Sequence, residues 1–554
     1  MFPKARKKFT IGGVALAGAL LLTSCSSSGT DTEASSSPSD VSGGTYSIAI
    51  EDPQTIVPTN CYELYCQQVL SATYTGLFTF EAGESGAYEV AQSELTSSVE
   101  ASDEGKNWKI TLNPGFTFTN GEKVTASTFV DTWNYTANGG NGQQLGFVFS
   151  PSYLNVAGYE DVSGPKTTGE KMSGLAVSKD DDLTIEVTLE KALSPEIFQN
   201  FLAGPQIMPM PTAGLKNPKA FDKQLIGNGP YMMAEPRTGQ EINVVKNPDY
   251  AGTAGLADAV DFRVYEDKQT MWADLQADNL DLIPDLPNNA LSSASEVLGD
   301  RYVNDPGALS YSFYGFASDS KTFKEKDVRV AISKAINWSE INEKIWFDTR
   351  STASSFAPDT IPGGGTDVCG DKCVFDATAA KSLLDGAGGL PGGSVEIGVI
   401  ASDSKDTQTA ACNQLQTNLG IECSLKSFSG FGEYLDFLAS GDAPDNFIYA
   451  LGWVADHPTI QSMITIFESS NFANDIQYSN SEVDRLIAEG NVATDPATQQ
   501  QKWVEAEQLI LEDFYAYPYQ MRNTVAGWSN RIDNVVVNPL GMINIPKISV
   551  IEQG

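Results

Sequence analysis

The feature that most limits how this chain can fold is its N-terminal end. Basic residues at positions 4, 6, 7 and 8 precede an apolar run from Phe9 to Leu22. That run is shorter than the roughly 20 residues that a membrane-spanning helix needs. A basic start followed by a short apolar stretch predicts a signal peptide over residues 1–24. No later apolar run approaches that length, so the rest of the chain is expected to fold after export.

The four residues Leu22-Thr23-Ser24-Cys25 resemble the bacterial lipobox. The resemblance implies that Cys25 becomes the mature N-terminus and carries fatty-acid chains such as palmitate, which anchor the protein to the membrane. The alternative is an ordinary secretory signal with an incidental cysteine. Small and polar residues dominate from Ser26 to Gly44, so residues 25–44 are predicted to be the lipidated cysteine and a flexible tether.

The charge and the histidine content exclude several classes of function. The 554 residues include 71 acids and 35 bases, for a formal net charge of -36, so we expect no nucleic-acid partner. His457 is the only histidine, and imidazole is the usual general base and metal ligand near neutral pH. We therefore expect no enzyme activity, no cofactor and no metal site. Paired carboxylates of the glycosidase kind stay open, because 71 acids always provide pairs.

Six further cysteines fall into three close pairs: Cys61 and Cys66, Cys369 and Cys373, Cys412 and Cys423. In the oxidising environment outside the cytoplasm, three local disulfides are the simplest prediction. A structural zinc site is the alternative, but the spacings C-x4-C and C-x3-C without a nearby histidine fit zinc poorly. Short loops lose little chain entropy when closed, so these bonds should fix local geometry more than the global fold.

Strand and helix patterns alternate along the body of the chain. Alternating apolar and polar residues predict strands over 108–112 and 183–189. Helical spacing of apolar residues predicts a helix after Asp327 and another over 503–514, the latter stopped by Pro518. Residues 395–400, 407–419 and 421–425 are predicted to be strand, helix and strand, a βαβ unit. The chain is therefore predicted to be an α/β protein.

A series of short motifs also runs along the chain in a fixed order. The early ones are Glu51-Asp52-Pro53, Tyr74-Thr75-Gly76-Leu77, Ser102-Asp103-Glu104-Gly105-Lys106 and Phe116-Thr117-Phe118-Thr119-Asn120-Gly121-Glu122. The later ones are Gly227-Asn228-Gly229-Pro230-Tyr231, Asn247-Pro248-Asp249-Tyr250, Asp327-Val328-Arg329, Ala335-Ile336-Asn337 and Leu419-Gly420-Ile421. Together they resemble the extracytoplasmic solute-binding proteins of ABC transporters in the peptide, opine and nickel family. Departures at Thr119, Ser127 and Thr128 change surface and capping chemistry only.

The resemblance covers nearly the whole mature chain and implies its architecture. It implies a two-lobed α/β fold of the type II periplasmic-binding-protein kind, with mixed sheets joined by crossover hinge strands. The lobes of such a carrier close around a solute. Lobe I is expected over residues 45–80, 204–306 and 520–554, with an extra subdomain over 81–203, and lobe II over 307–519.

The segment from Leu451 to Pro458 is similar to a ligand-binding motif of that family. In the family's oligopeptide binders, the aspartate of this motif pairs with the α-amino group of the peptide, so Asp456 is the first expected ligand residue. Trp453 would supply a flat apolar wall for a side chain. The alternative is that Asp456 caps a helix that begins near Pro458, while Trp453 fills the core.

His457 stands where the family has a tyrosine, which leaves the ligand class open. It is interpretable as a metal ligand, a pH-sensitive residue of the cleft, or a surface residue. Because one imidazole cannot make a tight metal site, a surface or cleft-wall position is expected. Tyr62 lies in a segment that the family places beside the cleft, and it is a further candidate, although such aromatics more often fill the core.

The resemblance implies a function without covalent chemistry. The chain is expected to be a monomer that is lipid-anchored at the outer face of the bacterial cytoplasmic membrane. There it would capture oligopeptides and deliver them to the transmembrane subunits of an ABC permease. An oligosaccharide, an opine or a metal complex is the alternative solute. An anchored extracellular hydrolase or chaperone is the alternative from a different class.

Overall fold

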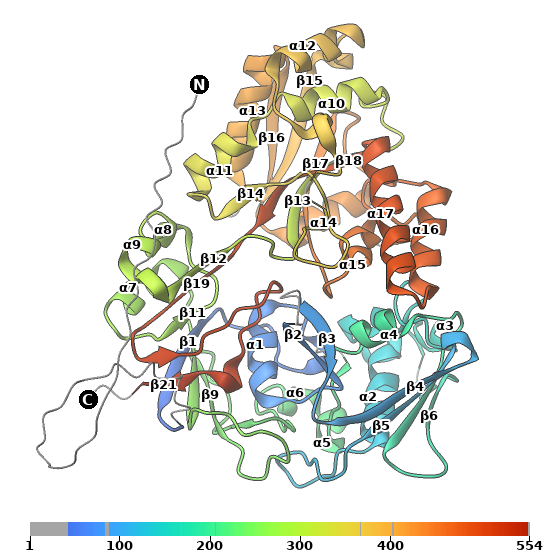
Figure 1. Ribbon diagram of the computed structural model, residues 1–554, viewed down its shortest axis with the longest axis vertical. Coiled ribbons are helices and arrows are strands. Elements are labelled where there is room, and N and C mark those ends of the chain that lie inside the picture. The colour runs from blue at the N-terminus through green and yellow to red at the C-terminus, as the bar shows by residue number, and fades with distance from the viewer. Residues whose placement is uncertain are drawn as a thin grey trace, which may run out of the picture. The chain divides into compact units, whose positions relative to one another are not determined.

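The computed structural model describes residues 42–82, 88–167, 169–204, 207–365, 367–400, 404–471 and 473–551 (Figure 1). The predicted signal peptide, Cys25 and most of the predicted tether lie outside these residues. Of the helices that are described, none is both long enough and apolar enough to cross a bilayer.

A seven-stranded mixed sheet is the centre of the part that we call lobe I. Its strand order is β12-β19-β11-β1-β10-β9-β8, and β1 runs parallel to β10 and β11. The strands are β1 (Thr45–Ile50), β8 (Tyr231–Met233), β9 (Glu241–Lys246), β10 (Ala259–Val264), β11 (Leu282–Ile283), β12 (Tyr302–Asp305) and β19 (Thr524–Trp528). The helices of this part are α1 (Leu64–Thr73), α5 (Thr212–Lys216), α6 (Pro218–Phe221), α7 (Lys268–Gln276), α8 (Asn288–Leu291) and α9 (Ala294–Leu298).

A six-stranded mixed sheet is the centre of lobe II. Its order is β14-β18-β13-β17-β15-β16. The strands are β13 (Ser310–Phe316), β14 (Arg350–Thr352), β15 (Ser394–Ile400), β16 (Glu422–Phe428), β17 (Phe447–Val454) and β18 (Ala516–Arg522). The helices are α10 (Lys326–Lys334), α11 (Trp338–Trp346), α12 (Ala377–Gly386), α13 (Lys405–Leu419), α14 (Phe431–Ser440), α15 (Ile460–Ile464), α16 (Ser481–Val492) and α17 (Pro496–Asp513).

A third, four-stranded antiparallel sheet forms what we call the subdomain, together with the helices α2 (Ala126–Ala137), α3 (Tyr159–Val162) and α4 (Pro195–Phe201). Its strands are β4 (Thr96–Ser102), β5 (Asn107–Leu112), β6 (Leu175–Val177) and β7 (Thr184–Thr188). The hairpin of β2 (Phe78–Ala82) and β3 (Tyr88–Gln92) precedes it. A short pair, β20 (Ile532–Asp533) with β21 (Ser549–Val550), lies near the C-terminus.

Two stretches of chain join the sheets of lobe I and lobe II. The first runs from β12 through residues 306–309 to β13, and the second from β18 through Asn523 to β19 (Figure 1). Both lobes therefore contain segments from distant parts of the chain. This arrangement matches the predicted two-lobed α/β fold with crossover strands.

The strands predicted from the alternating apolar residues are present in the structure. Ile185 and Val187 of β7 are buried, and they face the buried Trp108 and Ile110 of the neighbouring β5. The predicted βαβ unit is also confirmed, since β15, α13 and β16 follow one another and the two strands pair in parallel. The alternation of apolar and polar residues therefore predicted these strands correctly.

One detail of the predicted helices is wrong. Helix α17 ends at Asp513, where Phe514 adopts a left-handed conformation with φ of 59°, and not at Pro518. Pro518 lies inside β18, opposite Phe313, where the register between β13 and β18 shifts. A proline has no N–H to donate to a ladder, so it fits a strand at such an irregularity.

Three disulfides join Cys61 to Cys66, Cys369 to Cys373 and Cys412 to Cys423. The structure thus pairs these cysteines as the sequence analysis does. The third bond links α13 to β16 and so ties the helix of the βαβ unit to its second strand.

Helix α17 also brings a carboxylate into the interior of lobe II. Glu507 is 1% exposed, and its Oε1 accepts hydrogen bonds from the backbone N–H groups of Phe356 (2.6 Å) and Ala357 (3.1 Å). Its Oε2 has no partner among the described residues. Burial raises the pKa of Glu507 to about 7, even though the two N–H groups act in the opposite direction.

The buried Glu507 predicts a pH-dependent stability. Its folded-state pKa of about 7 exceeds the ordinary value of 4.5, so protonation favours the folded state. The free energy of unfolding should fall as pH rises through this window, by at most about 3 kcal/mol. We expect Glu507→Gln, which mimics the protonated acid, to show a smaller fall than the wild type, while Glu468 and Asp456 still contribute theirs. Denaturant unfolding at pH 5 and pH 8 measures it.

Glu512 on the same helix provides the matched control. Lys326 and Lys372 hold its pKa down at about 2, so it is ionised throughout this pH range. Glu512→Gln should therefore leave the pH dependence unchanged. An equal fall in the wild type and in Glu507→Gln would show that Glu507 is not responsible.

Candidate functional site

The carboxyl-terminal half of β17 has one open edge. β15 meets β17 only at Phe447 and Ile448, and no other described strand pairs with that edge farther along. On the other side, β13 pairs with β17 as far as Val454, and the Ala455 N–H donates to the Leu309 carbonyl (2.9 Å). Since hydrogen-bonding residues alternate in an antiparallel pair, Gly452 and Val454 direct their N–H and C=O groups to the open edge.

Asp456 follows directly after this edge. Its N–H donates to the Ser462 hydroxyl (2.8 Å), which fixes the backbone. Its side chain remains accessible, yet protein surrounds it closely enough that burial raises its pKa to about 6. Asp456 is thus exposed to solvent and still loses part of its hydration to neighbouring protein. Within the described residues, no cation or hydrogen-bond donor pairs with its oxygens.

Asp456 does not cap helix α15, so the capping alternative is wrong. Helix α15 begins at Ile460, and its N-cap is Thr459, whose side chain accepts a hydrogen bond from the Ser462 N–H (3.2 Å). The carboxylate of Asp456 is therefore not used by the helix. Its side chain is left available for a ligand.

Trp453 is half-buried in β17, opposite the buried Tyr311 of β13. Its indole Nε1 donates to the Ser462 carbonyl (2.7 Å), and the Tyr311 hydroxyl donates to the Met463 carbonyl (2.7 Å). Both aromatic residues therefore hold α15 against β17. This contact fixes the turn that carries Asp456.

His457 is a buried contact between lobe II and the subdomain, and not a surface residue. It is 1% exposed, and its ring meets Phe201 edge to face, with ring centroids 5.2 Å apart. Its Nδ1 lies 3.0 Å from the Thr459 hydroxyl. Burial lowers the pKa of His457 to about 3, so the imidazole is neutral at physiological pH. Among the described residues, no group of three His, Cys, Asp or Glu side chains is placed to hold a metal ion.

Tyr62 lies apart from these residues. It is 48% exposed, and its hydroxyl donates to the side chain of Gln54 (2.8 Å). The structure thus brings Trp453, Asp456 and His457 together, while no contact among the described residues links Tyr62 to them.

Three residues near Asp456 carry no motif in the sequence. Tyr153 and Phe201 come from the subdomain, and their rings lie 5.6 Å apart. Burial raises the pKa of Tyr153, and the charges of Asp456 and Glu468 raise it further, which places both acids near its hydroxyl. Glu468 follows α15, and burial raises its pKa to about 7. Only the fold brings these residues to Asp456.

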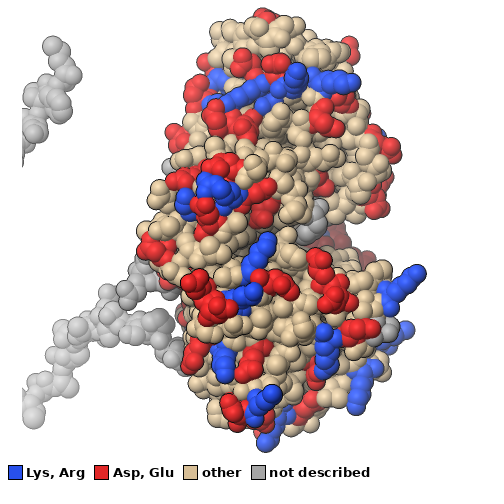
Figure 2. All heavy atoms as spheres, turned by 90° about the vertical axis from the view of Figure 1, so that its right-hand side faces the viewer, with Lys and Arg blue, Asp and Glu red and all other residues tan. Residues whose placement is uncertain are grey.

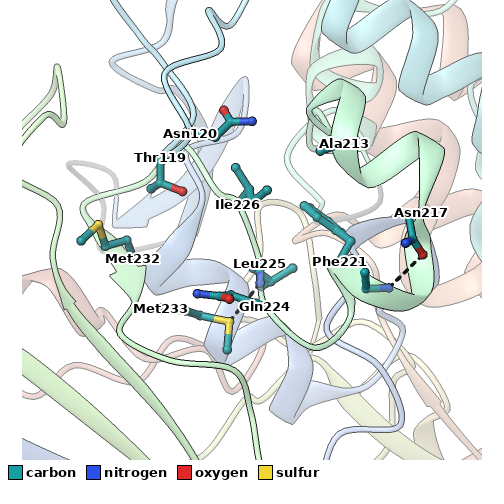
Figure 3. A pocket seen from close by; sticks show the side chains of 11 residues that line it. Thr119, Asn120, Ala213, Asn217, Phe221, Gln224, Leu225, Ile226, Met232 and Met233 are labelled. Carbon is teal, nitrogen blue, oxygen red and sulfur yellow. Dashed lines mark hydrogen bonds between the residues drawn. The ribbon is translucent and has the colours of Figure 1, made fainter.

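A separate pocket of about 620 Å³ lies between lobe I and the segment that joins β5 to α2 of the subdomain (Figure 3). Apolar side chains such as Phe221, Leu225 and Met233 line it, together with the polar Asn120 and Gln224. None of its lining residues is charged, and none is a predicted ligand residue. It does not include Asp456.

The charges on the face drawn in Figure 2 are mixed. Acidic and basic side chains are interspersed over both lobes, and neither sign forms a continuous field. On this face the strong negative charge of the chain thus serves solubility more than the attraction of one partner.

Comparison with known families decides the class of the protein. A family model described as "Bacterial extracellular solute-binding proteins, family 5 Middle" matches residues 91–475, which is more than half of the chain. The chain belongs to this family. The family predicted from the sequence motifs is confirmed.

Curated relatives of this family 5 protein include peptide binders. It is 22% identical over 437 residues to the periplasmic murein peptide-binding protein MppA of Escherichia coli, covering 76% of this chain and 78% of that protein. It is also 22% identical over 535 residues to the oligopeptide-binding protein OppA of Bacillus subtilis, covering 93% and 94%.

Solved structures show the same fold. The murein tripeptide-binding protein MppA of Escherichia coli superposes with a TM-score of 0.74 at 20% identity, covering 92% of this chain and 99% of that one. OppA of Haemophilus influenzae, solved in complex with the peptide RPPGFSPFR, gives a TM-score of 0.72 at 20% identity, covering 92% and 99%. The two-lobed fold of the family 5 protein is thereby established.

The buried position of His457 predicts an unusual titration. Because burial lowers its pKa to about 3, its ring signals should not shift between pH 5 and pH 8. His457 is the only histidine, so NMR of the protein without a histidine tag reads it without overlap. A titration midpoint near the ordinary value of 6.5 would contradict the buried contact with Phe201.

Proposed function

We propose that this family 5 protein is the extracytoplasmic binding component of an ABC importer and captures oligopeptides between its two lobes. The observation that carries the proposal is the unpaired carboxylate of Asp456 beside the open edge of β17. Lipidation at Cys25 would keep the carrier at the outer face of the membrane, next to the permease.

The carboxylate of Asp456 favours a cationic ligand group. A carboxylate that loses hydration to neighbouring protein recovers that free energy with a partner of opposite charge and matching hydrogen bonds. A peptide's terminal ammonium supplies one positive charge and three N–H donors. It therefore suits the carboxylate of Asp456 better than a neutral sugar does.

The open edge of β17 favours a peptide over other cations. Main-chain donors and acceptors of Gly452 and Val454 point to this edge, and both residues are exposed. An extended peptide can add to such an edge as a further strand, with its backbone satisfied by protein backbone. Recognition of this kind depends little on side chains, so peptides of many sequences would bind.

The proposal involves no covalent chemistry. The groups near Asp456 are the neutral imidazole of His457, the buried phenol of Tyr153 and the carboxyl group of Glu468. In the proposal they surround a ligand that is bound and released unchanged. Release to the permease would then follow from separation of the lobes, which removes the subdomain from Asp456.

Replacement of Asp456 tests the proposal. We expect Asp456→Asn to weaken the binding of a free-amine peptide by roughly 2–5 kcal/mol, since the buried ammonium loses its counter-charge. Binding of the N-acetylated form of the same peptide should be weak in both proteins. Isothermal titration calorimetry measures the four affinities.

Asp385→Asn is the control for this test. Asp385 is an exposed aspartate of lobe II that pairs with Lys381 on the surface of α12, and its replacement should leave peptide affinity unchanged. Equal affinities of the wild type and Asp456→Asn for the free-amine peptide would exclude Asp456 as its ammonium site.

A further inference from the structure

Buried contacts hold lobe II against the subdomain in this structure. His457 meets Phe201 edge to face, with ring centroids 5.2 Å apart. The Ser194 N–H donates to the Asn491 carbonyl (2.8 Å), and the side-chain amide of Gln499 donates to the Ser194 hydroxyl (2.7 Å). His457, Ser194 and Gln499 are each 1% exposed. We call this state, in which the two parts touch, the contact arrangement.

The two crossover stretches meet lobe II at one group of hydrogen bonds. Asn523 is the single residue between β18 and β19, and its backbone N–H donates to the Thr349 carbonyl (3.2 Å) (Figure 1). Its amide nitrogen donates to the Asn304 side-chain oxygen (2.7 Å) and to the Asp348 carbonyl (3.1 Å). Asn304 lies on β12, beside the other crossover, and its amide nitrogen donates to the same Asp348 carbonyl (3.3 Å). We call Asn304, Asp348 and Asn523 the hinge node.

The turn that supplies the Asp348 carbonyl is strained. It joins α11 to β14, and its residues Phe347 and Asp348 have φ of 49° and 58°. Residues with a side chain rarely adopt this left-handed conformation, and each of the two adds an unfavourable contribution. Phe347 is also 47% exposed, so burial of its ring does not offset the strain.

The hinge node also leaves one buried polar atom unpaired. The side-chain oxygen of Asn523 is buried and has no hydrogen-bond partner among the described residues. A buried acceptor without a partner is unfavourable, because it has lost its hydration. The strained turn and this oxygen both lie where the crossovers join lobe II. Movement of two lobes changes the backbone angles at such crossovers.

We propose that the hinge node opposes closure: it is strained in the contact arrangement and relaxed when lobe II and the subdomain separate. The effect of the node on ligand affinity rests on the proposed function, whereas its effect on the empty protein does not. The empty protein would populate the separated arrangement, and ligand binding would offset the strain on closure. Relief of the strain would therefore favour the contact arrangement.

Distances between the lobes in the empty protein test the hinge node. Spin labels at Lys166→Cys in the subdomain and Ser481→Cys at the start of α16 occupy exposed positions. In the protein that begins after Cys25, the six native cysteines are paired, so only the introduced thiols react. Double electron–electron resonance then measures the distance between the labels.

Two glycine variants relax the strained turn. Phe347→Gly and Asp348→Gly each place a residue there that adopts the left-handed conformation freely. We expect each variant to raise the ratio of the shorter to the longer label distance in the empty protein by roughly fivefold. Both native side chains are exposed, so neither change opens a cavity in the core.

Gln477→Gly is the matched control. Gln477 is an exposed residue of lobe II with φ of 54°, so glycine relieves the same kind of strain there. Its backbone bonds to Asn474 and Ser318, and not to the hinge node. The label distances should therefore stay as in the wild type. Thermal unfolding compares the stability of the variants, since glycine also raises the entropy of the unfolded chain.

Three results would overturn the role of the hinge node. They are label distances that shift no more than in Gln477→Gly, a shift toward the longer distance, and a wild type that shows only the shorter distance. Under the proposed function, Phe347→Gly should also bind a free-amine peptide up to about fivefold more tightly. If the wild type binds no peptide, the proposed function fails, while the distances in the empty protein still decide the role of the node.

Discussion

The proposed function depends on one group, the carboxylate of Asp456, which neighbouring protein partly desolvates and which has no counter-charge among the described residues. Removing such a group from water costs free energy, and the Asp456 pKa of about 6 reflects that cost. No described residue offsets it, because Thr459 caps the adjacent helix and the hydrogen bond from the Asp456 N–H goes to Ser462. A ligand cation bound to Asp456 would offset this desolvation cost, and unsatisfied groups of this kind are typical of binding sites.

The contact of lobe II with the subdomain begins at His457, directly after Asp456 in the chain. His457, Phe201 and the hydrogen bonds around Ser194 bring the two parts together beside Asp456. Under the proposed function, separation of the lobes would return water to Asp456 and weaken its hold on a cation. The proposal would thereby couple binding and release to one structural change.

Much of this structure could be predicted from local patterns, and the remainder could not. The alternation around Ile185 and the βαβ unit follow from periodicity, and Asp456 followed from a motif. Phe201 lies more than 250 residues from His457, and an aromatic residue in an amphipathic helix looks like ordinary core. Glu507 is one of 71 acids, and only its position inside lobe II makes its pKa unusual. Pro518 was wrongly predicted to end a helix, because a proline also fits a strand where the register shifts.

Native mass spectrometry tests the central claim most directly. The soluble protein beginning after Cys25 would be purified from cells grown in rich medium and measured before and after unfolding and refolding. The account predicts a distribution of bound peptide masses that disappears on refolding and returns when free-amine peptides are added. Protein that stays empty when such peptides are supplied, or that carries a single non-peptide mass, would contradict it.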